Sequence, residues 1–210
     1  MDSTHTAKTL LCFGDSITRR GGLPPSGWVW QLQYRLATAE PGRWIVHNAG
    51  VGGNTTTLAL DRFLTEVQPW LPAIVLVEFG INDCYIWTHA QVPRVSVDEY
   101  RRNLTEIARQ IRAGGGTPVF IVNHPMATEG GHTQGNRATV EANIQPYNQT
   151  VRDLVIALSL NVIDIPQEVE RRDIPREQIL AGDGVHLSDA GESIYCDIVY
   201  SHLADSYFQE

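Results

Sequence analysis

The sequence predicts an α/β protein in which a five-stranded parallel sheet has helices on both faces. Five short apolar runs, rich in Val, Ile, Leu or Phe, are bounded by turn residues and separated by amphipathic segments. Strands and helices that alternate in this way are typical of parallel sheets with right-handed crossovers. One run, "IVLVEF" at residues 74–79, is apolar almost throughout, as expected for a strand covered on both faces.

The chain of 210 residues is long enough for one domain with a substantial core. No repeat, low-complexity tract or linker interrupts it, so we expect a single domain over residues 1–210, with 1–8 as a flexible tail. The predicted strands share a short length and flanking turn residues, and they lie at residues 9–13, 44–47, 74–79, 118–122 and 162–165.

Apolar residues recur at helical spacing in five segments, which lie near residues 28–36, 55–67, 96–111, 144–158 and 188–203. Ser96 and Glu99 have the spacing of a capping box, which places the start of the third helix, and the glycines at 114–116 end it. Ser188 can cap the last helix, whose first turn is acidic and therefore suits the helix dipole.

Composition and charge exclude several classes of protein. Hydrophobic residues make up 42% and charged residues 19% of the chain, which indicates a folded globular protein. The net charge is −8 and no run of Lys or Arg forms a basic stripe, so we expect no nucleic-acid partner. No apolar stretch has the length of a membrane span or the pattern of a signal peptide, so we expect a cytoplasmic protein without a membrane partner.

Cofactors and metals are not expected either. Cys12, Cys84 and Cys196 have no CxxC spacing, which argues against a disulfide framework and a zinc site. His89, His124 and His132 do not have the spacing of metal ligands, and we expect them to be polar groups of the surface or of loops.

Polar and glycine-rich stretches follow the predicted strands, where the functional groups of open parallel sheets collect. Each stretch alone could be an ordinary turn, and "GVGGNT" fits neither common phosphate-binding pattern well. Together they favour one mechanism on one rim of the sheet. The stretches are "GDS" at 14–16, "NAGVGGNT" at 48–55, "GIND" at 80–83, "NHPM" at 123–126 and, before the last helix, "DGVH" at 183–186.

That mechanism is acyl transfer by a serine. A serine hydroxyl needs a base to take its proton, and His186 is the candidate, with Asp183 three residues earlier to orient the imidazole. The tetrahedral intermediate carries a negative oxygen that needs hydrogen-bond donors. Gly53 can supply a backbone N–H and Asn82 a side-chain N–H, beside the N–H of the nucleophile Ser16 itself.

The blocks "FGDSIT", "NAGVGGNTT", "GIND" and "DGVHLS" resemble, in the same order, the signature blocks of the SGNH hydrolases, the GDSL-type esterases and lipases. The resemblance extends over nearly the whole chain and implies a three-layer α/β/α fold of the flavodoxin-like type. It implies Ser16 as nucleophile, His186 and Asp183 as the rest of the triad, and Gly53, Asn82 and the Ser16 N–H as oxyanion donors. Gly53 is preferred to Gly52 because the family's glycine directly precedes an Asp/Asn-Thr pair.

Substrate contacts are expected from two long loops, 84–95 and 124–135, because long loops in a compact domain are often functional. Tyr85, Trp87 and Met126 can line a substrate pocket there, although such side chains can equally serve to anchor the loops. The loops also contain His, Thr, Gln, Asn and Gly, which suits a small ester with a polar alcohol better than a lipid surface.

The expected function is therefore hydrolysis of carboxylic esters, most simply short-chain, acetyl-type esters of a small molecule or carbohydrate. A thioesterase or lysophospholipase of the same family is the first alternative. An alternative of another class is a non-catalytic small-molecule-binding module on a flavodoxin-like fold, but the first loop carries Asp15 and Ser16 in place of a phosphate cradle. An α/β-hydrolase is disfavoured because the chain lacks the G-x-S-x-G motif.

Overall fold

One parallel sheet of five strands, in the order β2-β1-β3-β4-β5, forms the centre of the protein. The structure is a computed structural model that describes residues 7–129 and 134–208. All four neighbouring strand pairs are parallel, which confirms the predicted α/β class. The strands are β1 (Lys8–Gly14), β2 (Trp44–Gly50), β3 (Ile74–Glu78), β4 (Thr117–Val122) and β5 (Asn161–Asp164).

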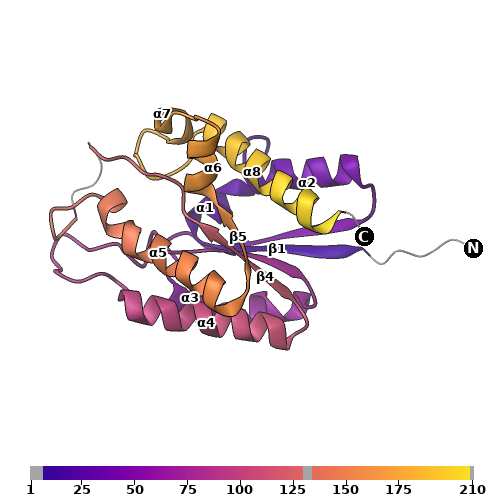
Figure 1. The fold of residues 1–210 in the computed structure, drawn as a ribbon, viewed down its shortest axis with the longest axis horizontal. Helices are drawn as coiled ribbons and strands as arrows, with labels where there is room; N and C mark the ends of the chain where they lie inside the picture. Colours follow the sequence, from indigo (N-terminus) through magenta and orange to yellow (C-terminus); the bar gives the residue numbers. More distant parts are fainter. Residues whose placement is uncertain (1–6, 130–133, 209–210) are drawn as a thin grey trace, which may run out of the picture.

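Helices cover both faces of the sheet, so the fold has three layers (Figure 1). On one face lie α2 (Trp28–Ala39) and α8 (Asp189–Tyr207), which contact each other; on the other lie α3 (Thr56–Glu66), α4 (Val97–Ala113) and α5 (Val140–Leu158). The shorter elements are α1 (Ser16–Gly21), the 3₁₀ helix η1 (Gln68–Trp70), α6 (Ile165–Arg171) and α7 (Arg176–Ile179).

The chain enters the sheet at β1, between β2 and β3, and the order in which it adds strands changes direction there. It passes from β1 outward to β2, then returns across β1 to β3 and continues to β5. The carboxyl ends of β1 and β3, which are adjacent, thus lead into connections that go to opposite sides of the sheet. Open α/β sheets bind their ligands at such a switch point.

The predicted caps are present. The Ser96 hydroxyl accepts the Glu99 N–H at 3.2 Å and begins α4, and the Ser188 hydroxyl accepts the Gly191 N–H at 2.9 Å and begins α8. Side-chain caps of this kind each contribute about 1 kcal/mol. These local signals are why the starts of both helices could be placed from sequence.

The core is densest around the two central strands. Leu10, Leu11, Cys12 and Phe13 of β1 are all fully buried. The Phe13 ring makes edge-to-face contacts with two other phenylalanines, at centroid distances of 5.1 and 6.2 Å. Each fully buried Leu or Phe contributes about 1.5–3 kcal/mol through the hydrophobic effect. The edge strand β2 is less covered, and its Ile45 is 49% exposed.

Several boundaries differ from the prediction. Strand β2 continues to Gly50 because its last residues pair in register with the end of β1, so Asn48 to Gly50 are strand rather than loop. The helices α1, α6 and α7 were not predicted, since they have too few residues to show an amphipathic repeat. Of the expected tail, residues 1–6 lie outside the described residues, and Lys8 already pairs with Trp44 in the sheet.

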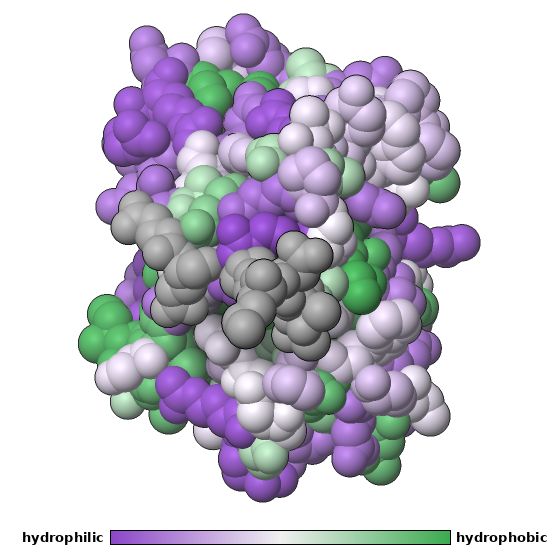
Figure 2. Space-filling model, turned by 90° about the vertical axis from the view of Figure 1, so that its right-hand side faces the viewer, coloured by the Kyte–Doolittle hydropathy of each residue, from purple (hydrophilic) through white to green (hydrophobic). Residues whose placement is uncertain are grey.

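The surface at one end of the molecule is mixed in hydropathy. At the end of the molecule opposite the carboxyl ends of the strands, hydrophilic and hydrophobic residues are interspersed (Figure 2). Among residues 7–129 and 134–208, no helix combines the length and the apolarity that crossing a bilayer would require.

A buried carboxyl group connects α8 to the start of α2. The N-cap of α2 is Gly27, which has no side chain to offer, and Glu192 of α8 accepts the Trp28 N–H at 2.8 Å instead. Burial raises the pKa of Glu192 from its ordinary value near 4.5 to about 7. The folded protein therefore holds a proton on Glu192 at pH values where the unfolded chain has released it.

We expect Glu192 to make stability fall as pH rises from about 4.5 to about 7, because in this window the native state binds more protons than the unfolded state. Glu192→Gln keeps an acceptor for the Trp28 N–H and removes the titration. The free energy of unfolding of the variant, relative to wild type, should rise by on the order of 2 kcal/mol between pH 5 and pH 8. Urea titrations at both values measure it, with the exposed Glu177→Gln as the control of equal charge. A difference that does not change with pH would contradict the assignment.

Candidate active site

The carboxyl ends of β1, β2 and β3 bring three of the predicted blocks to one rim, at the left of Figure 1. Gly14, the last residue of β1, is level with Gly50 of β2 on one side and with Glu78 of β3 on the other. The stretches that follow these strands therefore begin at the same height. The loop that precedes α8 joins them there through His186, whose ring contacts Ser16.

Ser16, His186 and Asp183 form a continuous chain of hydrogen bonds. Ser16 Oγ lies 2.9 Å from His186 Nε2, and His186 Nδ1 lies 2.6 Å from Asp183 Oδ2. The other Asp183 oxygen accepts the backbone N–H groups of Val185 and His186, at 3.0 and 2.9 Å. One carboxylate thus shapes the loop and orients the imidazole.

The charge of Asp183 determines which imidazole nitrogen carries the proton. Partial burial acts to raise the pKa of Asp183, but hydrogen bonds from the ring and backbone of His186 and from the Val185 N–H lower it to about 2. The ionised carboxylate accepts the proton of Nδ1. Nε2 is then free to accept a proton from the Ser16 hydroxyl.

Ser16 is held at the start of a helix by its neighbours. It is the first residue of α1, and Asp15 caps that helix by accepting the Ile17 N–H at 3.0 Å. A Cβ atom at Gly14 would lie 2.1 Å from Thr18 Oγ1 and 2.8 Å from the Glu78 carbonyl oxygen, so only glycine lets the first turn of α1 approach β3 this closely. The N–H of a first helical residue has no acceptor within the helix.

The amide of Asn82 is held at both ends. Its Nδ2 donates to Asp15 Oδ2 at 2.9 Å, and its Oδ1 accepts a hydrogen bond from the Arg94 guanidinium at 3.4 Å. A donor on one side and an acceptor on the other set the orientation of the amide. Within the described ranges no acceptor takes the second N–H of Nδ2, which a ligand can therefore use.

Beneath these groups lies a pair of buried carboxyls, Asp15 and Glu78. Burial raises the pKa of Asp15 to about 6, and burial together with the charge of Asp15 raises that of Glu78 well above its usual range. Asp15 accepts hydrogen bonds from two N–H donors, whereas Oε1 of Glu78 has no partner in the described part of the chain. We therefore expect the pair to carry its proton on Glu78 and its charge on Asp15.

Gly52 and Gly53 face the same rim, and both are exposed. Gly53 has φ +75°, a conformation that favours glycine, and no residue within 7–129 or 134–208 accepts its N–H. A Cβ atom at Gly52 would come within 4.0 Å of the Ser16 Cβ, so this turn lies beside the serine. The structure thus places Gly53 in the turn beside Ser16, and its role as an oxyanion donor stays a prediction.

Arg62 of α3 is a residue that the sequence analysis missed. Its guanidinium donates to the carbonyl oxygens of Gly14 at 3.0 Å and Ala49 at 2.8 Å, and to Asn54 Oδ1 at 2.7 Å. It thereby ties together the ends of β1 and β2 and the turn that follows β2. Glu66 one turn later balances its charge at 2.6 Å. An arginine on an amphipathic helix gives no sequence signal for such an inward role.

His124 also has a role that was not expected. It was predicted to be a polar group of the surface or of a loop; it lies in the loop after β4, but it is buried, at 1% exposed, and its Nε2 lies 2.8 Å from the Val185 carbonyl oxygen. Burial lowers its pKa to about 4, so the ring is neutral at pH 7 and donates this hydrogen bond. His124 thereby supports the residue next to His186. His89 is exposed, as expected, and His132 lies outside the described residues.

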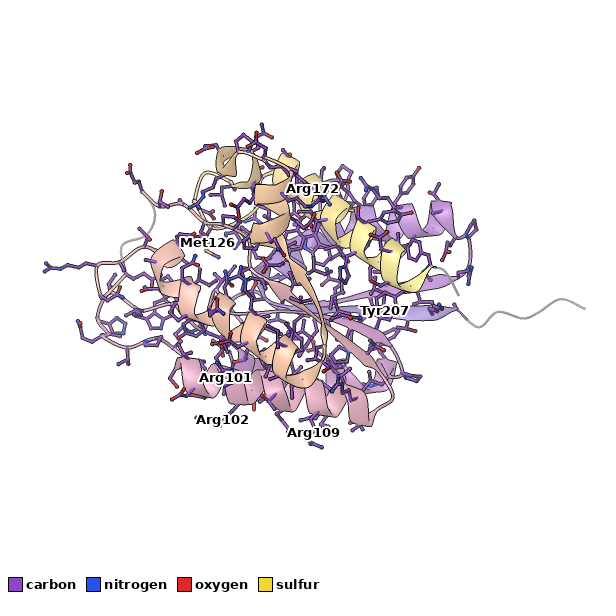
Figure 3. The ribbon with its side chains drawn as sticks, viewed as in Figure 1. Arg101, Arg102, Arg109, Met126, Arg172 and Tyr207 are labelled. Carbon is purple, nitrogen blue, oxygen red and sulfur yellow. The ribbon has the colours of Figure 1, made fainter. Side chains whose placement is uncertain are left out.

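The predicted substrate-binding residues have different locations. Met126 is fully buried and its side chain lies inside the protein (Figure 3), so the prediction that it lines an open pocket was wrong. The apolar side chain is part of the hydrophobic core. Tyr85 is half-buried and Trp87 is 49% exposed, and their rings meet edge to face at 5.1 Å. For these two, substrate binding stays a prediction.

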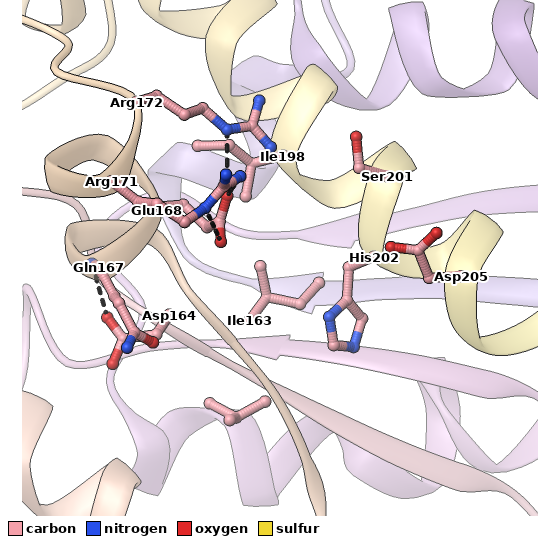
Figure 4. A pocket seen from close by; sticks show the side chains of 11 residues that line it. Ile163, Asp164, Gln167, Glu168, Arg171, Arg172, Ile198, Ser201, His202 and Asp205 are labelled. Atoms are coloured by element: carbon pink, nitrogen blue, oxygen red, sulfur yellow. Dashed lines mark hydrogen bonds and ion pairs between the residues drawn. The ribbon is translucent and has the colours of Figure 1, made fainter.

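Two pockets differ in their position relative to the candidate site. One of about 450 Å³ adjoins the candidate site and is largely polar, with Asp183, Glu129, Arg176 and Glu177 among its lining residues. Another, of about 300 Å³, lies between β5, α6 and α8 (Figure 4), and none of the predicted site residues lines it. Within the described ranges, no three His, Cys, Asp or Glu side chains are grouped as a metal site.

Comparison with known proteins identifies a family. The model of the GDSL-like lipase/acylhydrolase family matches residues 12–194. The chain is 35% identical to the uncharacterized lipoprotein YqeF of Bacillus subtilis, over 74% of this chain and 69% of that protein. It is 36% identical to the esterase TesA of Pseudomonas aeruginosa, over 55% of this chain and 54% of that protein.

A solved structure has the same fold. The acetylxylan esterase Axe2 of Geobacillus stearothermophilus superposes with a TM-score of 0.75, at 24% identity, over 96% of each chain. At this identity the likeness concerns the fold alone.

We expect Asn82→Ala to lower kcat by roughly 10²–10³-fold, the usual effect of one lost oxyanion donor. KM should change little, because an oxyanion donor stabilises a negative charge that develops only in the transition state. Steady-state kinetics on a soluble ester measure both constants. Asn161→Ala, an exposed amide on β5, is the control. An unchanged kcat with a raised KM would instead make Asn82 a substrate-binding residue.

Proposed function

The chain belongs to the GDSL-like lipase/acylhydrolase family and is an ester hydrolase, and we propose that Ser16, His186 and Asp183 carry out its reaction. The observation that supports this most directly is the chain of hydrogen bonds at 2.9 and 2.6 Å that connects the three side chains. A non-catalytic binding module would have no need for a serine, an imidazole and a carboxylate hydrogen-bonded in this order.

In the proposed mechanism Ser16 Oγ attacks the ester carbonyl carbon while its proton passes to His186 Nε2. The tetrahedral intermediate collapses, the C–O bond to the alcohol breaks, and the alcohol leaves with the proton from Nε2. Water then attacks the acyl-enzyme and gives a proton to Nε2. The second intermediate releases the carboxylic acid, and Ser16 recovers its proton.

The oxyanion of both intermediates is stabilised by hydrogen-bond donors that are already in place. We assign this role to the N–H groups of Ser16 and Gly53 and to the second N–H of Asn82. Asp15 positions Asn82 through the 2.9 Å hydrogen bond, so the amide needs no rearrangement during the reaction. No step requires a metal or a cofactor.

For the substrate we propose a short-chain, acetyl-type ester of a small polar molecule or carbohydrate. The pocket beside Asp183 is largely polar, and the core location of Met126 removes one apolar wall from the rim. An acetylxylan esterase with the same fold acts on such an ester. A cytoplasmic location and the absence of nucleic-acid and membrane partners stay predictions of the sequence.

Ser16→Ala should abolish turnover while leaving the fold intact, because a hydroxyl at a helix start contributes little stability. A fluorophosphonate probe should label the wild-type protein once and the Ser16→Ala variant not at all. Ser201→Ala, on the surface of α8, should be labelled like the wild type. Substantial ester hydrolysis by a folded Ser16→Ala protein would contradict the assignment of the nucleophile.

The proposed acyl preference predicts that kcat/KM is highest for acetyl to butyryl esters and falls steeply for longer chains. The reason is that the rim offers polar rather than apolar contacts to an extended chain. Matched p-nitrophenyl esters from acetate to decanoate, each below its solubility limit, measure it. A maximum at octanoyl or longer would show that an apolar channel accepts the acyl chain.

A further inference from the structure

Arg94 places a cation directly beside the predicted oxyanion donor Asn82. Its guanidinium donates to Asn82 Oδ1 at 3.4 Å and lies 5.8 Å from the centroid of the Trp87 ring. The side chain is half-buried. Among residues 7–129 and 134–208, no carboxylate lies within the 4.0 Å of an ion pair. Removing a guanidinium from water is costly where no acidic group compensates its charge.

The position of Arg94 is set by the backbone of its loop. The Arg94 N–H donates to the Tyr85 carbonyl oxygen at 3.0 Å, and the Val95 N–H donates to the Asp83 carbonyl oxygen at 3.1 Å. The loop that leaves the rim after Asn82 thus returns to the same place. Gln134 holds its outer part by accepting the Ile86 N–H at 2.7 Å. The cation is therefore held at the rim.

Two buried acids near the rim, Asp15 and Asp83, do not form an ion pair with Arg94. Asp15 and Asp83 are both 0% exposed, and each uses an oxygen on an inward donor: Asp15 on the Ile17 N–H, Asp83 on the Thr56 N–H at 2.9 Å. Arg62 differs from Arg94 in this respect: its guanidinium is also close to the site, but it forms an ion pair with Glu66 at 2.6 Å. Arg94 is left with donors that a ligand can use.

A second cation lies on the other side of Ser16. A Cβ atom at Gly52 would be 3.2 Å from a terminal nitrogen of Arg19 and 4.0 Å from the Ser16 Cβ. Arg19 is exposed, and no carboxylate of the described residues pairs with it. Two guanidinium groups thus lie on opposite sides of the candidate nucleophile, in a protein whose net charge of −8 would otherwise repel anions.

We propose that the ester substrate carries an anionic group, a carboxylate or a phosphate, which Arg94 binds through charge-assisted hydrogen bonds and Arg19 attracts. This rests on the proposed function, and it narrows the substrate class from a short polar ester to an anionic one. The planar guanidinium suits both oxyanions, because each can accept two parallel N–H donors. The anion can belong to the acyl part or to the alcohol part of the ester, and experiment can distinguish these sources.

Two matched pairs of esters test the proposal. Monomethyl succinate and methyl butyrate differ in whether the acyl chain ends in a carboxylate or a methyl group. 4-Acetoxybenzoate and 4-methylphenyl acetate differ in the same way in the alcohol part. Release of acid is followed at constant pH for the wild type, Arg94→Gln, Arg94→Lys and the control Arg102→Gln. Arg102 is an exposed residue of α4 whose side chain points outward (Figure 3), so its removal changes the net charge equally.

We expect Arg94→Gln to lower the ratio of kcat/KM for the anionic ester to that for its neutral partner by about tenfold in one of the two pairs. The change should appear mainly in KM for the anionic ester. Arg94→Lys should recover part of the ratio, because it keeps the charge without the planar fork, and Arg102→Gln should leave it unchanged. Because any effect of Arg94 on the orientation of Asn82 acts on both members of a pair, the ratio isolates recognition of the anion.

Three results would overturn the proposal. An equal loss on both members of each pair would show that Arg94 only positions Asn82. An unchanged ratio with normal rates would show that the substrate contacts neither charge. Both leave ester hydrolysis through Ser16 standing. If the wild type hydrolyses none of the four esters, the proposed function itself fails, and the inference about its substrate fails with it.

Discussion

The register of β1 with its two neighbours, β2 and β3, is the constraint on which the rest of the site depends. Gly14 is in register with Gly50 on one side and with Glu78 on the other, so three loops leave the sheet at one level. Helix α1 then passes so close to β2 that a Cβ atom at Gly50 would lie 2.2 Å from the backbone nitrogen of Arg19. Arg62 binds the carbonyl oxygens of Gly14, the last residue of β1, and of Ala49, the residue before the last of β2, and so ties the two strand ends together.

Buried polar and charged side chains hold the groups of this rim in position. Asp15, fully buried, caps the helix that begins with Ser16 and also accepts the amide of Asn82, so one carboxylate positions the nucleophile and a predicted oxyanion donor. A charge in such a place is costly unless its oxygens are hydrogen-bonded, as both oxygens of Asp15 are. The neutral His124, beneath the loop of His186, completes this support without adding a charge.

The sequence analysis succeeded where the signal is local or where polar residues directly follow a buried strand. Caps at Ser96 and Ser188, the five apolar runs and the blocks around Ser16 and His186 are all short patterns, each interpretable within a few residues. It failed for Met126 because an apolar residue in a long loop can face the core or the rim, and sequence does not distinguish these. It missed Arg62 because that arginine acts on carbonyl groups 13 and 48 residues away in the chain.

By itself the sequence determined the α/β class, the order of strands and helices along the chain, and the residues capable of acyl transfer, because these follow from periodicity, capping and side-chain chemistry. The strand order β2-β1-β3-β4-β5 was implied only by the family resemblance, and tertiary structure alone decided the 2.9 Å contact between Ser16 and His186, which lie 170 residues apart. It also decided that Arg94 lies beside Asn82 without an acidic partner among the described residues. Distances between remote segments depend on how the layers pack, and packing is a property of the whole chain rather than of any short stretch.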